Sequence, residues 1–135
     1  MLIQLQALHV ELRESLRNLA SSLRKVEPDH DAVSAARLKL AKIQRRRRSL
    51  IHSSILPQLR GAPDPAGTQI AALMLEDARV ATELSTHIGR WTTSSIRADW
   101  ASYQRASAHM RASVLRQMER EATVLYPLLE DMAGS

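Results

Sequence analysis

The sequence predicts an all-α protein, and within that class an up-down-up-down four-helix bundle. Phe is absent and aromatic residues make up 3% of the chain, so the core must come mainly from aliphatic side chains, which suit helices. Four Gly and five Pro are too few for the many turns of an all-β fold. Apolar residues recur every three or four positions in four segments joined by mostly short connections. A length of 135 residues fits one domain, residues 1–135.

The first two predicted helices are separated by a short turn around Pro28. The first ends near Glu27, and Asp29 or Asp31 can cap the second, which stops near Pro57. The first stripe comprises Leu5, Leu8, Leu12, Leu16, Leu19 and Leu23, and the second Val33, Ala36, Leu40, Ile43, Leu50 and Ser54.

The third predicted helix follows the loop of residues 61–67, which is rich in Gly and Pro. Thr68 is its predicted N-cap, and Gly89 is its predicted stop. Its apolar stripe comprises Ile70, Leu73, Val80, Leu84 and Ile88.

The fourth predicted helix, over 95–132, would be roughly 57 Å long and exceeds its partners. Its first turns must therefore overhang, bend or form a separate short helix, and Pro127 should kink its end. If the region around Trp100 and Tyr103 were exposed, it would favour a homodimer. Its stripe comprises Ile96, Trp100, Tyr103, Met110, Val114, Met118, Leu125, Leu128 and Met132.

Each apolar stripe is interrupted near mid-length by a polar or charged residue. Burying a charge is costly unless the charge is paired or ligated, so one such residue on every helix predicts a buried polar centre. Its members are His9, Arg47, Asp77, Gln117 and Glu121.

Several motifs resemble those of hemerythrin-like (HHE-type) domains. Residues 8–13, Leu-His-Val-Glu-Leu-Arg, resemble the first-helix signature of that family, and residues 121–129 are similar to its closing Glu…Tyr-Pro motif. Residues 50–59 resemble the end of its second helix, and residues 75–77 fall where its third helix usually reads Glu-His. The resemblance implies a four-helix bundle in which His9 and Glu121 occupy iron-ligand positions.

The chain departs from that family at the other ligand positions. The family places His and Glu four residues apart on its second and fourth helices, where this chain has Arg47 with Ile51 and Gln117 with Glu121. The third helix has Asp77 in place of His. His52 is one residue out of register with the second-helix site, and we expect it to point elsewhere.

These departures leave three readings of the centre. Arg is not a metal ligand, so Arg47 can replace the metal and pair with Asp77 or Glu121, with Gln117 and His9 completing the hydrogen bonds. Alternatively, His9, Asp77 and Glu121 hold one iron, zinc or manganese ion, and the protein senses or carries a small ligand such as oxygen. In the third reading, Arg47 extends to solvent. We expect no cofactor, with iron as the alternative.

The net charge of +5 is concentrated in residues 37–48, which carry no acid. Arg45, Arg46 and Arg48 form either a solvated helix face or a contact for anions or nucleic acid. Residues 9–13 also loosely resemble the phosphoacceptor helix of histidine phosphotransfer bundles, a reading that requires an exposed His9. We expect surface roles for His30, His87 and His109.

Composition and motifs favour a non-catalytic module. No nucleophile–base pair or Gly-rich phosphate loop has a recognisable spacing, and the absence of Cys excludes thiol chemistry. No segment resembles a signal peptide or a membrane span, so we expect a cytoplasmic location. The sequence therefore predicts a regulatory or interaction module with an unidentified protein partner.

Overall fold

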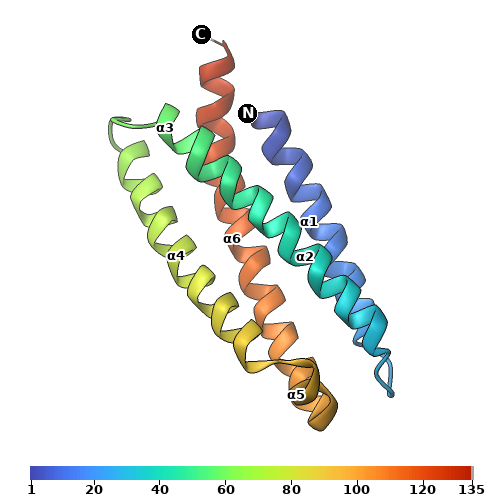
Figure 1. Ribbon diagram of the computed structural model, residues 1–135. Helices are drawn as coiled ribbons and strands as arrows, with labels where there is room; N and C mark the ends of the chain where they lie inside the picture. The colour runs from blue at the N-terminus through green and yellow to red at the C-terminus, as the bar shows by residue number, and fades with distance from the viewer. Residues whose placement is uncertain (135) are drawn as a thin grey trace.

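The computed structural model describes residues 1–134, and every regular element in that range is a helix (Figure 1). The all-α prediction is therefore confirmed. None of these helices combines the length and apolar character needed to cross a membrane. The elements are α1 (Leu2–Ser22), α2 (His30–Leu50), η1 (Ile51–Ile55), α3 (Leu56–Gln58), α4 (Ala66–Arg90), α5 (Thr93–Ala98) and α6 (Trp100–Gly134).

The long helices pack in preferred pairs. The closest pairs are α1 with α2 and α4 with α6, and α1 also packs against α6. In Figure 1 the N-terminus of α1 and the C-terminus of α6 lie at the same end of the molecule. Within residues 1–134, α2 and α4 are not among the closely packed pairs. The seam between α2 and α4 is therefore loosely packed.

Capping side chains fix several helix starts. Asp29 caps α2 by accepting a hydrogen bond from the Ala32 N–H at 3.1 Å, as predicted. The cap predicted at Thr68 is wrong, because α4 already begins at Ala66 and the Asp64 carboxylate accepts from the Thr68 N–H at 3.1 Å. At the other end, α4 runs one residue beyond the predicted stop at Gly89.

The long fourth segment is divided at Asp99 into α5 and α6, so the alternative of a separate short helix is confirmed. Thr92 caps α5 through a hydrogen bond from the Ser95 N–H at 3.3 Å. The aromatic region packs on its own chain, since Tyr103 is buried and the Trp100 indole donates to the Lys25 carbonyl at 3.1 Å. The helix α6 continues through Pro127.

The apolar stripes of α1 and α6 are buried almost throughout, but that of α4 is not. All six leucines predicted for α1 are buried, whereas α4 buries only Leu73, Asp77 and Val80. Ile88, predicted to be part of the core, is 56% exposed. The reason is that α4 packs closely on α6 and leaves its α2-facing side loosely covered.

The interior consists of two apolar clusters separated by a polar layer. One cluster includes Leu12, Ile43 and Met118, and the other includes Leu5, Ile51 and Leu125. The side chains of His9, Arg47 and Glu121 come from positions between these pairs on α1, α2 and α6.

Candidate functional site

All five residues of the predicted polar centre lie in the interior. Their relative exposures are 4% for His9, 1% for Arg47, 4% for Asp77, 1% for Gln117 and 0% for Glu121. The reading in which Arg47 extends to solvent is therefore wrong. A guanidinium at this depth needs buried partners, because an isolated charge in the interior is strongly unfavourable.

Glu121 is the hub of the centre. Its Oε1 accepts a hydrogen bond from His9 Nε2 at 2.8 Å, and its Oε2 accepts one from the Arg47 guanidinium. The other imidazole nitrogen of His9, Nδ1, accepts from the Tyr126 hydroxyl. Burial raises the pKa of Tyr126, which keeps this hydroxyl protonated as a donor. The result is a continuous network from α2 through α6 to α1.

Asp77 occupies the α4 side of the centre, and its partners come from the neighbourhood of Arg47. Its Oδ1 lies 3.9 Å from Arg47 Nη2, and its Oδ2 lies 3.1 Å from Arg48 Nη2. The same oxygen lies 3.1 Å from His52 Nε2. The two buried carboxylates therefore face one buried guanidinium, that of Arg47, and one partly exposed guanidinium, that of Arg48.

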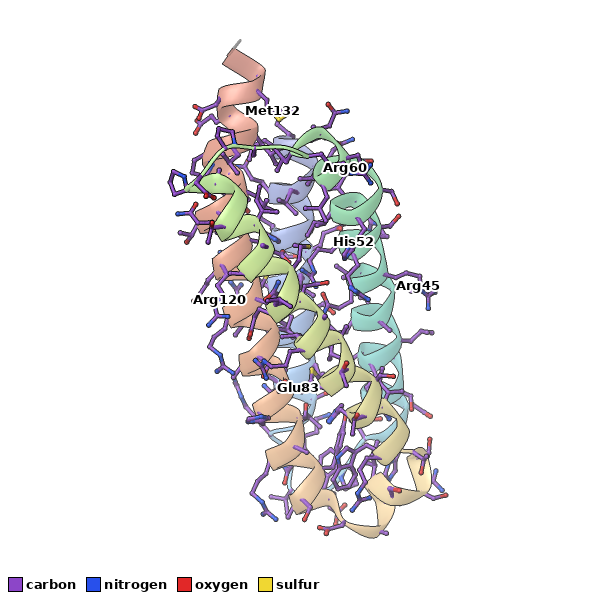
Figure 2. All side chains as sticks on the ribbon, turned by 90° about the vertical axis from the view of Figure 1, so that its left-hand side faces the viewer. Arg45, His52, Arg60, Glu83, Arg120 and Met132 are labelled. Atoms are coloured by element: carbon purple, nitrogen blue, oxygen red, sulfur yellow. The ribbon has the colours of Figure 1, made fainter. Side chains whose placement is uncertain are left out.

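The placement of His52 corrects one prediction. His52 lies in η1, a π-helical segment, and Figure 2 shows it on the side of the chain that faces α4. His52 lies four residues after Arg48, so the two side chains share one face of the chain and reach the same Asp77 oxygen. The prediction that His52 points away from the centre is therefore wrong.

Gln117 is buried with the others, but it does not complete their hydrogen bonds. Neither its amide nitrogen nor its amide oxygen has a partner within residues 1–134. Gln44, which was not predicted, instead accepts from Arg47 Nε at 2.8 Å. The spacing in the sequence could have predicted this contact, because residues three apart in a helix lie on one face and can touch.

The donor set does not fit a di-iron centre, which needs about five to seven protein donors. Only His9, Asp77 and Glu121 offer donor atoms at the family's positions, and both Glu121 oxygens are already engaged. Within residues 1–134, no three or more His, Cys, Asp or Glu side chains gather in an arrangement that could hold a metal ion. The positive charge of Arg47 would in addition repel a cation at this place.

The three neighbouring arginines do not share one surface. Arg46 pairs with Glu11 of α1 at 3.0 Å, while Arg48 turns toward Asp77 of α4. Arg45 extends outward from α2 (Figure 2). This division weakens the nucleic-acid reading, which needs a continuous basic face. The phosphotransfer reading also fails here, because His9 is buried and bonded at both nitrogens.

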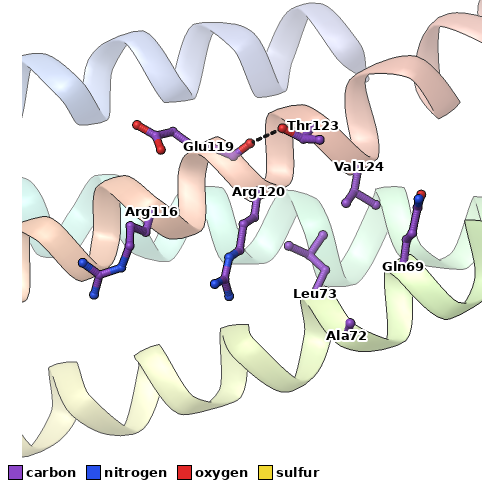
Figure 3. A pocket seen from close by; sticks show the side chains of 8 residues that line it. All are labelled: Gln69, Ala72, Leu73, Arg116, Glu119, Arg120, Thr123 and Val124. Carbon is purple, nitrogen blue, oxygen red and sulfur yellow. Dashed lines mark hydrogen bonds between the residues drawn. The ribbon is translucent and has the colours of Figure 1, made fainter.

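A separate hollow of about 540 Å³ lies between α4 and α6 (Figure 3). Three of the polar side chains along it already have partners. Arg120 pairs with Glu76 at 3.2 Å, Arg116 donates to the Ser113 hydroxyl at 3.3 Å, and the Thr123 hydroxyl donates to the Glu119 carbonyl oxygen at 3.0 Å. This hollow therefore offers a ligand few free polar groups.

No model of a known protein family matches the chain, and no curated protein or solved structure matches it. Only the geometry of the polar centre therefore points to its function.

Proposed function

We propose that this chain is a hemerythrin-like, up-down-up-down four-helix bundle in which Arg47 takes the place of the metal, and that it serves as a non-catalytic regulatory or interaction module. The observation that carries the proposal is the Arg47 guanidinium at the middle of the interior, bonded to Glu121 and facing Asp77. A positive charge between two carboxylates is the electrostatic equivalent of a cation at that place.

The contact between His9 and Glu121 also supports the family assignment. His9 and Glu121, the two residues that keep the family's ligand identity, are in direct contact at 2.8 Å. Residues that are 112 positions apart in sequence therefore meet where the resemblance requires. A protein without a reactive centre acts through what it binds, and we assign that role to an unidentified protein partner.

The alternative is a metal protein with an altered site, in which His9, Asp77 and Glu121 bind one iron ion and a small ligand such as oxygen. The contact between His9 and Glu121 favours it to the extent that two donors are already adjacent. It requires Glu121 to release Arg47, which would leave a buried guanidinium without its closest partner.

Elemental analysis of the untagged protein, purified from cells grown with iron, zinc and manganese, separates the two. The proposal predicts metal far below one equivalent. Stoichiometric metal that is lost in His9→Ala and Glu121→Ala would instead establish the alternative.

A second variant tests the family assignment itself. Replacing Arg47→His, Ile51→Glu, Asp77→His and Gln117→His restores the family's ligands at the matching positions, and we expect this protein to gain iron. Arg47→Leu alone is the control, because it removes the guanidinium without adding a donor. A helical restored variant that binds no iron would overturn the assignment.

A further inference from the structure

A cavity of about 220 Å³ lies in the loose seam between α2 and α4, apart from the polar centre. Leu40 of α2, Leu84 of α4 and Met110 of α6 give it apolar walls. Ile88, which is 56% exposed, and Arg45 stand at its border with solvent. Mostly apolar walls with a few polar groups are typical of small-molecule sites.

Gln44 supplies a buried donor with no partner. The residue is 8% exposed, and its Oε1 is held by Arg47 Nε at 2.8 Å. Because that bond fixes the amide orientation, Nε2 is the free end, and it has no hydrogen-bond partner in the described structure. A buried N–H donor without an acceptor is costly, so an acceptor supplied by a ligand would be favourable here.

Arg37 adds a positive charge without a countercharge. Its Cζ lies 5.7 Å from the centroid of the Tyr103 ring, and no carboxylate in residues 1–134 lies within ion-pair distance of it. Arg45 also lines the cavity, whereas no Asp or Glu does. The cavity is therefore electropositive and selects against cations.

His87 completes the polar lining. Its ring stacks on Tyr103 with centroids 5.9 Å apart, and its Nε2 is buried without a partner among residues 1–134. Burial, with a smaller effect of Arg37, lowers the pKa of His87, so the imidazole is neutral at pH 7. Burial likewise raises the pKa of Tyr103, which stays neutral. The surface role expected for His87 is thus wrong.

Size narrows the class of ligand. A water molecule occupies about 30 Å³, and a cavity of about 150 Å³ can hold a benzene ring. We propose that the seam cavity binds a small organic monocarboxylate with a ring-sized apolar body, whose carboxylate meets Arg37 and the free amide of Gln44. This site goes beyond the proposed function and does not depend on it, because Arg37 and the apolar walls lie outside the polar centre. Only Gln44, whose Oε1 accepts from Arg47, takes part in both.

Calorimetric titration with three probes tests the proposal on the full chain. Benzoate combines the ring and the charge, benzyl alcohol keeps the ring without the charge, and inorganic phosphate keeps a charge without the ring. We expect saturable binding of benzoate. Benzyl alcohol should bind at least about tenfold more weakly, since a hydrogen bond to a charged group contributes that much. Phosphate should also bind at least about tenfold more weakly, since it buries no apolar surface in the cavity. Absence of benzoate binding, or equal binding of either other probe, would overturn the proposal.

Two matched pairs of variants locate the site. Arg37→Gln should weaken benzoate binding roughly tenfold, whereas Lys39→Gln, which removes the same charge from an exposed position on α2, should leave it nearly unchanged. Ala41→Leu fills the cavity and should abolish binding, while Ala35→Leu on the exposed face should not. Benzoate binding that survives both Arg37→Gln and Ala41→Leu would place the ligand elsewhere and refute the assignment.

Discussion

The polar centre and the seam cavity are neighbours that use the same amino-acid types in opposite ways. In the centre, the guanidinium of Arg47, the carboxylate of Glu121 and the imidazole of His9 bond to one another. In the cavity, Arg37 and His87 have no carboxylate or hydrogen-bond partner within residues 1–134. The hydrogen bonds of the centre join α1, α2 and α6, with Asp77 of α4 at its edge, whereas the cavity lies where α2 and α4 pack loosely.

This difference separates two roles for buried polarity. Apart from Gln117, whose amide has no partner within residues 1–134, the side chains of the centre are bonded to one another. Such a network contributes to the stability and alignment of a fold, but it has few groups left for a ligand. An unsaturated cluster costs stability, and it gains most from a ligand that supplies the missing partners. Gln44 belongs to both the polar centre and the seam cavity. Its amide oxygen accepts a hydrogen bond from Arg47, while its amide nitrogen has no partner within residues 1–134.

The largest expected effect is at the hub of the centre. Glu121→Gln keeps the side-chain volume but leaves Arg47 without its buried counterion, so the free energy of unfolding should fall by about 3 kcal/mol or more. Urea denaturation measures this loss, and Glu119→Gln on the exposed face of α6 is the control. The double variant Arg47→Leu/Glu121→Leu should recover most of the loss, because apolar replacement of a buried pair is often neutral. Equal stability of Glu121→Gln and the wild type would mean that the pair contributes nothing.

Asp77 should matter less, because its nearest partners, Arg48 and His52, are partly exposed. Asp77→Asn should lower the free energy of unfolding by about 1–2 kcal/mol, the usual cost of removing one member of a charge-assisted hydrogen bond. The same denaturation experiment compares it with Glu121→Gln. A larger loss of unfolding free energy than that of Glu121→Gln would show that Asp77 of α4, and not Glu121 of α6, contributes most to the stability of the centre.

The cavity should appear in the pH dependence of stability through His87. Since its folded pKa lies below the unfolded value near 6.5, the unfolded chain takes up a proton first as the pH falls. The free energy of unfolding should therefore decrease from about pH 7 downward and level off below the folded pKa. His87→Gln should remove this part of the decrease, whereas His109→Gln, at an exposed position, should retain it. An unchanged profile in His87→Gln would contradict the role assigned to burial.

The smallest effect is expected at the residue next to Arg47. Arg46 is exposed and pairs with Glu11 at 3.0 Å, and exposed pairs contribute only about 0–1 kcal/mol. Arg46→Ala should change the free energy of unfolding by less than about 1 kcal/mol, and the change should shrink further in high salt. A loss comparable to that of Glu121→Gln would show that the run of arginines stabilises the fold as a unit.

Much of the fold and part of the centre could be predicted from the sequence. Stripes with a helical period identify the helices directly, and a polar residue inside a stripe identifies an interior position. This pattern predicts interior positions for His9, Arg47 and Glu121, and all three are buried. The sequence leaves the partner of Arg47 open between Asp77 and Glu121, and in the structure Arg47 lies closest to Glu121.

The remaining features depend on geometry that periodicity does not carry. The contact of His52 with Asp77 depends on how close the chain at η1 lies to α4, which no residue in the sequence marks. The unpartnered amide of Gln117 and the cavity beside His87 depend on how far apart the helices stand. Helix spacing results from the packing of all side chains at once, so a stripe on one helix cannot predict it.

The polar layer between the two apolar clusters also defines the register of the helices. Sliding α6 by one turn, about 5.4 Å, would carry Glu121 to the level of Leu5 or Leu12 and leave His9 and Arg47 facing apolar side chains. Leucine-rich stripes alone tolerate such a slip, because one leucine replaces another. A single buried ion pair makes the slipped arrangement expensive, so the chain has one preferred alignment rather than several of similar energy.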